Sequence, residues 1–119
     1  VTKNAYKPTG GPWSVLCDAR LKKNIQPLKD ALEKLLKLHG ITFEWKEPQK
    51  HGNLKGRQMG LLADDVEKVF PEWISTVNGY KAVTYRGFEA LVIEAIRQLK
   101  EENEILKLKI AELEKRLQR

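Results

Sequence analysis

Cys17, His39 and His51 are the residues of this chain whose types most often do nucleophilic or metal chemistry, and they are few and far apart. Cys17 is the single cysteine, so a disulfide within the chain is excluded, and a lone thiol is more often an inert buried group than a nucleophile. The two histidines do not have the spacing of metal ligands. Asp64-Asp65 is only a weak signal for a metal or an acid pair, because the helix dipole favours acidic residues at a helix start. Residue types and spacing alone therefore predict no metal and no cofactor.

The chain has 119 residues, enough for one domain with an appendage but not for two large domains. Hydrophobic residues make up 41% of it and can form a core, although a chain of this size buries only about two-thirds of its unfolded surface. No apolar run approaches the roughly 18–20 residues of a membrane span, and the first ten residues lack a signal-peptide pattern. We expect a soluble protein with no membrane partner.

The net charge of +6 is concentrated in the first half of the sequence. Residues 1–60 hold twelve basic and five acidic side chains, whereas residues 61–119 hold ten and eleven. A basic half can meet phosphate, but its lysines fall between apolar residues, as on a solvated helix face. The tryptophans are not interleaved with basic residues, so we interpret them as core or interface anchors rather than a base-stacking platform: Trp13, Trp45 and Trp73. We do not expect a nucleic-acid partner.

Two short helices are predicted ahead of the C-terminal region. Apolar residues recur every three or four positions after Pro27, a residue favoured in a first helical turn, and this pattern predicts an amphipathic helix that ends at His39-Gly40 with a glycine C-cap. A second helix over 63–70 should end before Pro71, because the residue before proline is pushed out of the helical region. The face of the first helix consists of Leu28, Ala31, Leu32, Leu35, Leu36 and Leu38.

The remaining elements before the C-terminal region are extended segments and loops. Residues 1–12 are rich in glycine and proline and predict an irregular lead-in. Two β-rich runs around Asn78-Gly79 give the strongest hairpin signal. Strands or extended segments are expected at 13–16, 41–45, 57–62, 74–77 and 80–85, with a polar loop at 48–56.

The C-terminal region predicts a single long helix with a coiled-coil pattern. No glycine or proline follows Gly87, so the helix from about Phe88 should span some 30 residues. Glu102 faces Lys107 of a neighbour across the g and e positions, which favours parallel association. A monomer would leave the apolar stripe in water at about 1.5–3 kcal/mol per large side chain. The stripe has Ile96, Asn103, Ile110 and Leu117 at position a, and Val92, Leu99, Leu106 and Leu113 at position d.

The number of helices in this coiled coil is not fixed by the heptads. Isoleucine at a, leucine at d and the single polar Asn103 at a favour a parallel dimer on general rules. A further alternative is that the stripe packs back on the core of its own chain. The continuation of the pattern to the last residues argues against that alternative.

Several motifs in order resemble the intramolecular chaperone domain of the endosialidase type, the C-terminal self-cleaving module of phage tail spikes and fibres (peptidase family S74). A similar module occurs in transcription factors of the myelin regulatory factor type. The resemblance runs from about residue 17 to residue 100. It rests on Cys-Asp-Ala-Arg-Leu-Lys-Lys-Asn-Ile at 17–25, Phe-Glu-Trp at 43–45, Gly-Leu-Leu-Ala-Asp-Asp-Val-Glu-Lys-Val-Phe-Pro-Glu at 60–72, Val-Thr-Tyr at 83–85 and Leu-Val-Ile-Glu-Ala-Ile at 91–96.

The resemblance implies a module that trimerises, drives the folding of the protein fused ahead of it and is released by self-cleavage. By position in the family motif, Cys17 is the nucleophile, Lys22 is the base and Leu16–Cys17 is the scissile bond. A thiol needs a group that takes its proton, and a desolvated lysine can serve. Because five residues put Lys22 on neither the same helical face nor the same strand face as Cys17, a turn or a neighbouring subunit must bring them together.

The sequence departs from the family pattern at two positions. Cys17 replaces the family serine, and Asp64 stands where glutamine is usual. A thiol is the better nucleophile, but its larger size can misplace it in a site shaped for serine. Sixteen residues still precede Cys17, so we expect impaired cleavage rather than slow or conditional cleavage. Asp18 and Arg20 can pair with each other or with neighbouring residues to hold the loop, a structural role.

The prediction is therefore an α+β protein with a small antiparallel sheet, helices and a long C-terminal helix that forms a parallel homotrimeric coiled coil. Residues 1–16 are the remnant of the upstream client, 17–86 the chaperone and cleavage core, and 87–119 the oligomerisation helix. The expected function is a trimerising chaperone of an upstream tail spike or fibre protein, acting in the host cytoplasm during virion assembly, with its product in the virion tail. The alternatives are a non-catalytic coiled-coil module of a DNA-binding or transcription-factor-type protein, and an oligomerisation tag without cleavage.

Overall fold

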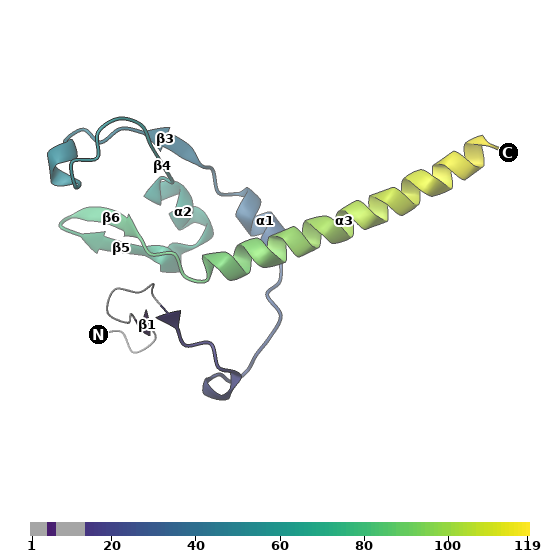
Figure 1. Cartoon of the computed structure of the whole chain (residues 1–119), viewed down its shortest axis with the longest axis horizontal. Helices are drawn as coiled ribbons and strands as arrows, with labels where there is room; N and C mark the ends of the chain where they lie inside the picture. Colours follow the sequence, from purple (N-terminus) through teal and green to yellow (C-terminus); the bar gives the residue numbers. More distant parts are fainter. Residues whose placement is uncertain (1–4, 7–13) are drawn as a thin grey trace.

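The computed structural model describes residues 5–6 and 14–119, with side chains from residue 15 onward. It is an α+β chain in which a head of helices and two-stranded sheets carries one long projecting helix (Figure 1). We use "head" for residues 31–98. The α+β class and the long C-terminal helix predicted from the sequence are confirmed.

The three α-helices are α1 (Ala31–Leu36), α2 (Ala63–Val69) and α3 (Phe88–Leu117). The predictions for α2 and α3 are confirmed, but α1 is shorter than predicted at both ends. It cannot begin in the turn after Pro27 because Asp30 adopts a left-handed conformation (φ 57°) directly before it. Its last turn tightens at Leu38, whose N–H donates to the carbonyl oxygen of Leu35, so the expected glycine cap at Gly40 is wrong.

The strands form three separate two-stranded antiparallel sheets rather than the one small sheet predicted. In the first, β1 (Ala5–Tyr6) pairs with β2 (Ser14–Val15), so a short strand interrupts the lead-in that we predicted to be irregular. The second pairs β3 (Ile41–Phe43) with β4 (Gln58–Gly60), and Thr42 lies opposite Met59. The predicted segment at 13–16 and the strands at 41–45 and 57–62 are confirmed, though shorter.

The third sheet is the predicted hairpin of β5 (Ile74–Val77) and β6 (Tyr80–Val83). Asn78 and Gly79 connect the strands with φ values of 51° and 81°. Two positive φ values in sequence define the type I′ turn, whose twist matches that of a β-hairpin. Glycine and asparagine tolerate this conformation, which explains why the dipeptide identifies the hairpin from the sequence alone.

The core of the head lies where α1, α2 and the start of α3 meet. Six hydrophobic residues are buried there: Ala31, Val66, Phe70, Trp73, Leu91 and Ala95. Trp73, at the end of the 3₁₀ turn Pro71–Trp73, is its largest member and stacks on Phe70 with ring centroids 4.1 Å apart. The carbonyl oxygen of Trp73 also accepts from the N–H of Thr84 at 2.7 Å, which ties this turn to the end of β6. The anchor role predicted for Trp73 is confirmed, whereas Trp13 lies outside the described residues.

α1 packs against the first turns of α3. The backbone N–H of Leu32, one of the unpaired donors at a helix start, donates to Oε1 of Gln98 at 2.8 Å. Leu91 and Ala95 of α3 lie buried at the same junction. α3 is therefore anchored in the head by its N-terminal turns.

The segment between β3 and β4 forms the predicted loop, with a 3₁₀ turn at Pro48–Lys50. His51 stacks on Trp45 with ring centroids 3.7 Å apart, and Trp45 meets Phe43 edge to face. Trp45 is therefore half-buried by its own loop rather than by the core. Across residues 5–6 and 14–119, no helix combines the length and hydropathy needed to cross a membrane.

Candidate functional site

The segment that carries the family motif is fully exposed in the single chain. Every residue from 15 to 30 is exposed, and we call this segment the arm. The arm runs from α1 along the outside of the head (Figure 1). Five large apolar side chains on it are exposed: Val15, Leu16, Leu21, Ile25 and Leu28. Exposed apolar side chains in such density are typical of a surface that another chain covers.

One short 3₁₀ turn, Ala19–Leu21, separates Cys17 from Lys22. Both side chains are exposed, and no hydrogen bond joins them within the described part of the chain. The sequence allowed either a turn or a neighbouring subunit to bring Lys22 to Cys17, and the structure contains a turn between them. The turn shortens the chain path between the two residues, and the described hydrogen bonds include none between them.

The turn is held by an ion pair between Asp18 and Arg20. Nη2 of Arg20 donates to Oδ2 of Asp18 at 2.7 Å, and Nε donates to Oδ1 at 3.1 Å, so the pair is bidentate. The backbone N–H of Arg20 also donates to Oδ1 of Asp18 at 2.9 Å, which makes Asp18 the N-cap of the turn. The pairing predicted from the sequence is confirmed. Arg20 holds the pKa of the Asp18 carboxyl below its ordinary value through these hydrogen bonds.

Most of the heptad stripe of α3 is exposed to solvent, and its last six members lie beyond the head. Val92, the first member, is half-buried and Asn103 is exposed. The other six a and d side chains are also exposed: Ile96, Leu99, Leu106, Ile110, Leu113 and Leu117. The stripe therefore does not pack on the core of its own chain, and that alternative is wrong.

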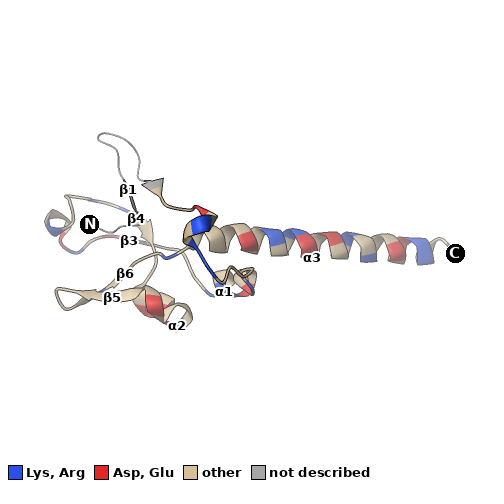
Figure 2. Cartoon of the chain, turned by 90° about the horizontal axis from the view of Figure 1, so that it is seen from below, with Lys and Arg blue, Asp and Glu red and all other residues tan. Residues whose placement is uncertain are grey.

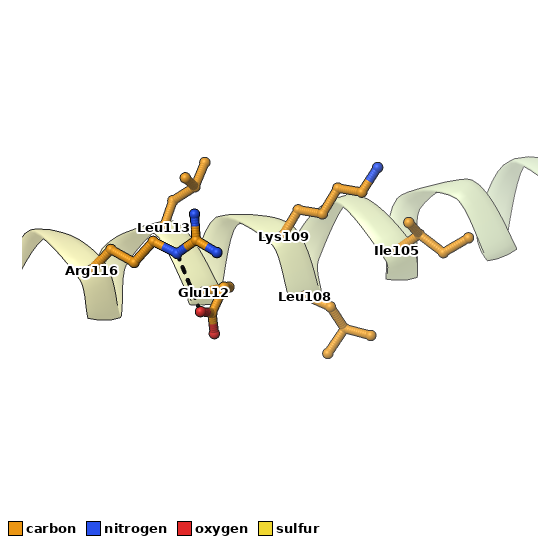
Figure 3. A pocket seen from close by; sticks show the side chains of 6 residues that line it. All are labelled: Ile105, Leu108, Lys109, Glu112, Leu113 and Arg116. Atoms are coloured by element: carbon orange, nitrogen blue, oxygen red, sulfur yellow. Dashed lines mark hydrogen bonds and ion pairs between the residues drawn. The ribbon is translucent and has the colours of Figure 1, made fainter.

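A second apolar patch on α3, away from the stripe, was missed by the heptad analysis. Ile105 and Leu108 line a shallow groove of about 430 Å³ together with Lys109, Glu112, Leu113 and Arg116 (Figure 3). At about 100° per residue, Ile105 and Leu108 lie roughly 130° and 170° around the helix from the centre of the a and d positions. An ion pair of 3.4 Å from Arg116 to Glu112 covers part of this groove. A helical projection of the whole region, rather than of the heptad alone, identifies it.

A cleft of about 710 Å³ lies between the loop after β3 and the β5–β6 hairpin. Trp45 and His51 line it from the loop, and Tyr80 and Lys81 line it from the hairpin. Sequence reasoning missed this cleft, because no local pattern relates segments some thirty residues apart. Among the described residues, no three His, Cys, Asp or Glu side chains gather as metal ligands.

Asp64, one of the two departures from the family pattern, lies in an ion-pair cluster on α2. Nζ of Lys81 donates to Oδ1 of Asp64 at 2.6 Å and to Oε1 of Glu67 at 3.0 Å, which joins β6 to α2. The hydrogen bond and charge of Lys81 lower the pKa of Asp64. The hydrogen bonds from Lys81 to the two carboxylates raise the pKa of its own ammonium group.

We expect Lys81→Met to lower the melting temperature slightly at neutral pH and to have a smaller effect at about pH 2. A carboxyl whose folded pKa is lowered stabilises the fold above its unfolded pKa of about 3.9, and this contribution is lost as pH falls through the folded pKa. The Lys81 ammonium, whose folded pKa is raised, stabilises the fold up to its unfolded pKa of about 10.4 and ceases to do so as pH rises through the folded value. The effect is small because all three groups are exposed to solvent. Thermal melts of both proteins across pH test this; an equal difference at pH 2 and pH 7 would contradict it.

The charges along α3 alternate in sign (Figure 2). Four of its six basic side chains pair with glutamates on the same helix, as Lys100 does with Glu104 at 2.9 Å and Arg97 with Glu94 at 3.6 Å. Lys107 also contacts Glu104, at 3.4 Å. This arrangement is typical of a solvated coiled-coil exterior and lacks the basic stripe of a nucleic-acid interface.

Comparison with known proteins agrees with the motif at the arm. Residues 17–75 match the family model described as chaperone of endosialidase. The chain is 33% identical over 110 residues to the long tail fibre protein Gp37 of Enterobacteria phage Ox2 and 32% identical over 110 residues to that of phage M1; each match covers 86% of this chain and 44% of the relative. The Gp37 protein of phage K3 is 30% identical over 101 residues, which are 80% of this chain and 8% of that protein. The chain thus spans less than half of these relatives, and through residues 17–75 it belongs to the chaperone of endosialidase family.

Proposed function

We propose that this chain is a trimerising intramolecular chaperone that assists the folding and assembly of a tail fibre protein fused ahead of it. The observation that carries this proposal is the row of exposed apolar a and d side chains on α3, beyond the head. Burying such a row between parallel helices contributes about 1.5–3 kcal/mol per large side chain. The choice of three chains over two follows the family resemblance and not the heptads. The client segment ends at about residue 16, the core spans 17–86 and the assembly helix spans 87–119.

Gathering three chains by their α3 helices would set the register of the upstream polypeptides. Tethered chains meet at a high effective concentration, and β-rich fibres that form contacts distant in sequence otherwise fold slowly. The chaperone would act in the host cytoplasm during virion assembly, and its product would enter the virion tail.

Self-cleavage would then separate the product from the chaperone at Leu16–Cys17. Sγ of Cys17 attacks the carbonyl carbon of Leu16, the bond to the nitrogen of Cys17 breaks, and Lys22 transfers the thiol proton to that nitrogen. The result is a thioester between Leu16 and Cys17 and a free α-amine. Water then attacks the thioester, which yields the Leu16 carboxylate and the free thiol.

The exposed arm supports completion of this site on assembly. A solvated lysine is a poor base, and exclusion of water strengthens the interactions that move a proton. The apolar side chains of the arm, among them Leu21 and Ile25, give a neighbouring chain a surface to cover. Cys17 in place of serine would slow the reaction by misplacing the nucleophile.

The test is the variant Cys17→Ser of the 119-residue chain. We expect it to release residues 1–16 and to leave a product that begins at position 17, as read by mass spectrometry. Cys17→Ala controls for cleavage by contaminating proteases and stays intact, and Lys22→Ala in the Cys17→Ser background stops the reaction. A folded, oligomeric Cys17→Ser chain that remains whole would overturn the self-cleavage proposal and leave the assembly role to be judged by oligomer mass.

A further inference from the structure

The bidentate pair of Asp18 and Arg20 needs an explanation beyond stability. Both side chains are exposed, with 89% of Arg20 and 42% of Asp18 accessible to solvent. Pairs this exposed contribute little to the free energy of unfolding. The arm around them contacts no core, so the pair does not anchor it to the head. What the pair does fix is the local path of the chain.

That path determines how far Lys22 lies from Cys17. Five extended residues span up to roughly 17 Å, whereas a 3₁₀ turn rises only about 2 Å per residue. The N–H of Leu21 donates to the carbonyl oxygen of Asp18, and the N–H of Lys22 donates to that of Ala19, each at 3.0 Å. The closed turn therefore brings the backbone of Lys22 close enough for its long, flexible side chain to approach Cys17.

We propose that Asp18 and Arg20 are positioning residues for self-cleavage, which hold the turn that presents Lys22 to Cys17. This inference rests on the proposed function of the Leu16–Cys17 bond. Asp18 acts twice, as the N-cap of the turn and as the partner of the guanidinium, whereas Arg20 acts through its side chain only. Neither touches the reacting atoms.

The two roles of Asp18 predict an order of effects in the Cys17→Ser background. Asp18→Ala removes the cap and the ion pair, so we expect cleavage about a hundredfold slower. Arg20→Ala leaves the backbone bond to Oδ1, and Asp18→Asn keeps an oxygen for that bond, so each should slow cleavage by only about tenfold. The conservative Asp18→Asn thus recovers part of the rate that Asp18→Ala loses. Combining Asp18→Ala with Arg20→Ala should cost no more than Asp18→Ala alone, because the partners act as a unit.

Lys29→Ala, at another exposed lysine of the arm, is the matched control and should cleave at the rate of the Cys17→Ser parent. Light scattering and thermal melting should be unchanged in all these variants, which separates positioning from assembly or folding. If the parent cleaves and Asp18→Ala cleaves equally fast, the positioning role is wrong and the proposed function stands. If the parent itself does not cleave, the positioning role fails together with the self-cleavage proposal, and the assembly role is judged separately by oligomer mass.

Discussion

Replacing Leu106 with aspartate is expected to convert the assembled protein into monomers. Leu106 occupies a d position in the middle of the stripe, and 53% of it is exposed in the single chain. In a parallel trimer three such leucines meet in one layer, so the substitution removes about 1.5–3 kcal/mol of burial per chain and places three carboxylates together in an apolar site. Light scattering should report a mass that falls from three chains to the 13.7 kDa of one.

Leu108→Asp is the matched control for this prediction. Leu108 is more exposed, at 71%, but it lies on the opposite side of α3 from the a and d positions. If dissociation resulted from any loss of apolar surface, Leu108→Asp would dissociate at least as readily as Leu106→Asp. We expect it to keep the parent mass. Equal masses for both variants, or a parent that is monomeric at micromolar concentration, would contradict the coiled-coil assignment.

Trp73→Ala is expected to lower the free energy of unfolding by about 3–5 kcal/mol, the usual cost of truncating a buried aromatic residue. Trp73 is 3% exposed and packs against Phe70, Tyr85 and Phe88. Among the residues that the structure describes, the buried core has six members, so few contacts can compensate for the loss. Domains are stabilised by about 5–15 kcal/mol in total. Urea unfolding followed by circular dichroism should show a partly or wholly unfolded head at room temperature.

Trp45→Ala tests whether the effect is particular to the core. Trp45 has the same side chain but is half-buried against Phe43 and His51 in the loop after β3. We expect Trp45→Ala to lower the free energy of unfolding by about 1 kcal/mol, the usual contribution of a single aromatic pair with limited burial. A loss as large as that of Trp73→Ala would mean that the loop belongs to the cooperative core.

Local signals predicted the elements whose formation depends on local chemistry. The hairpin follows from the sequence because its turn depends only on the positive φ values at Asn78 and Gly79. α3 follows because no glycine or proline interrupts the chain after Gly87. α1 was predicted too long because the apolar periodicity continues to Leu28 and Leu38, which lie outside the helix. Its boundary depends on the left-handed Asp30, which no periodicity identifies.

Part of the candidate site was predictable because some of its contacts are local in sequence. The pairing of Asp18 with Arg20 is a contact between residues two apart, and it could be inferred directly. The sequence could not decide whether a turn or a neighbouring subunit brings Lys22 to Cys17, because this depends on the backbone path between the two residues. The cleft near Trp45 and Tyr80 depends on the packing of two separate sheets and left no local signal.

α3 runs without a break from the buried Leu91 to the solvent-exposed Leu117. Association of its distal half would therefore link the stability of the head to the concentration of the chain. Any association of the distal turns favours the helical state of the proximal turns, on which the head is built. Under the proposed assembly, mass action would make the head more stable as chains accumulate. Nascent copies made side by side on one message would fold together, whereas an isolated copy would lack that support.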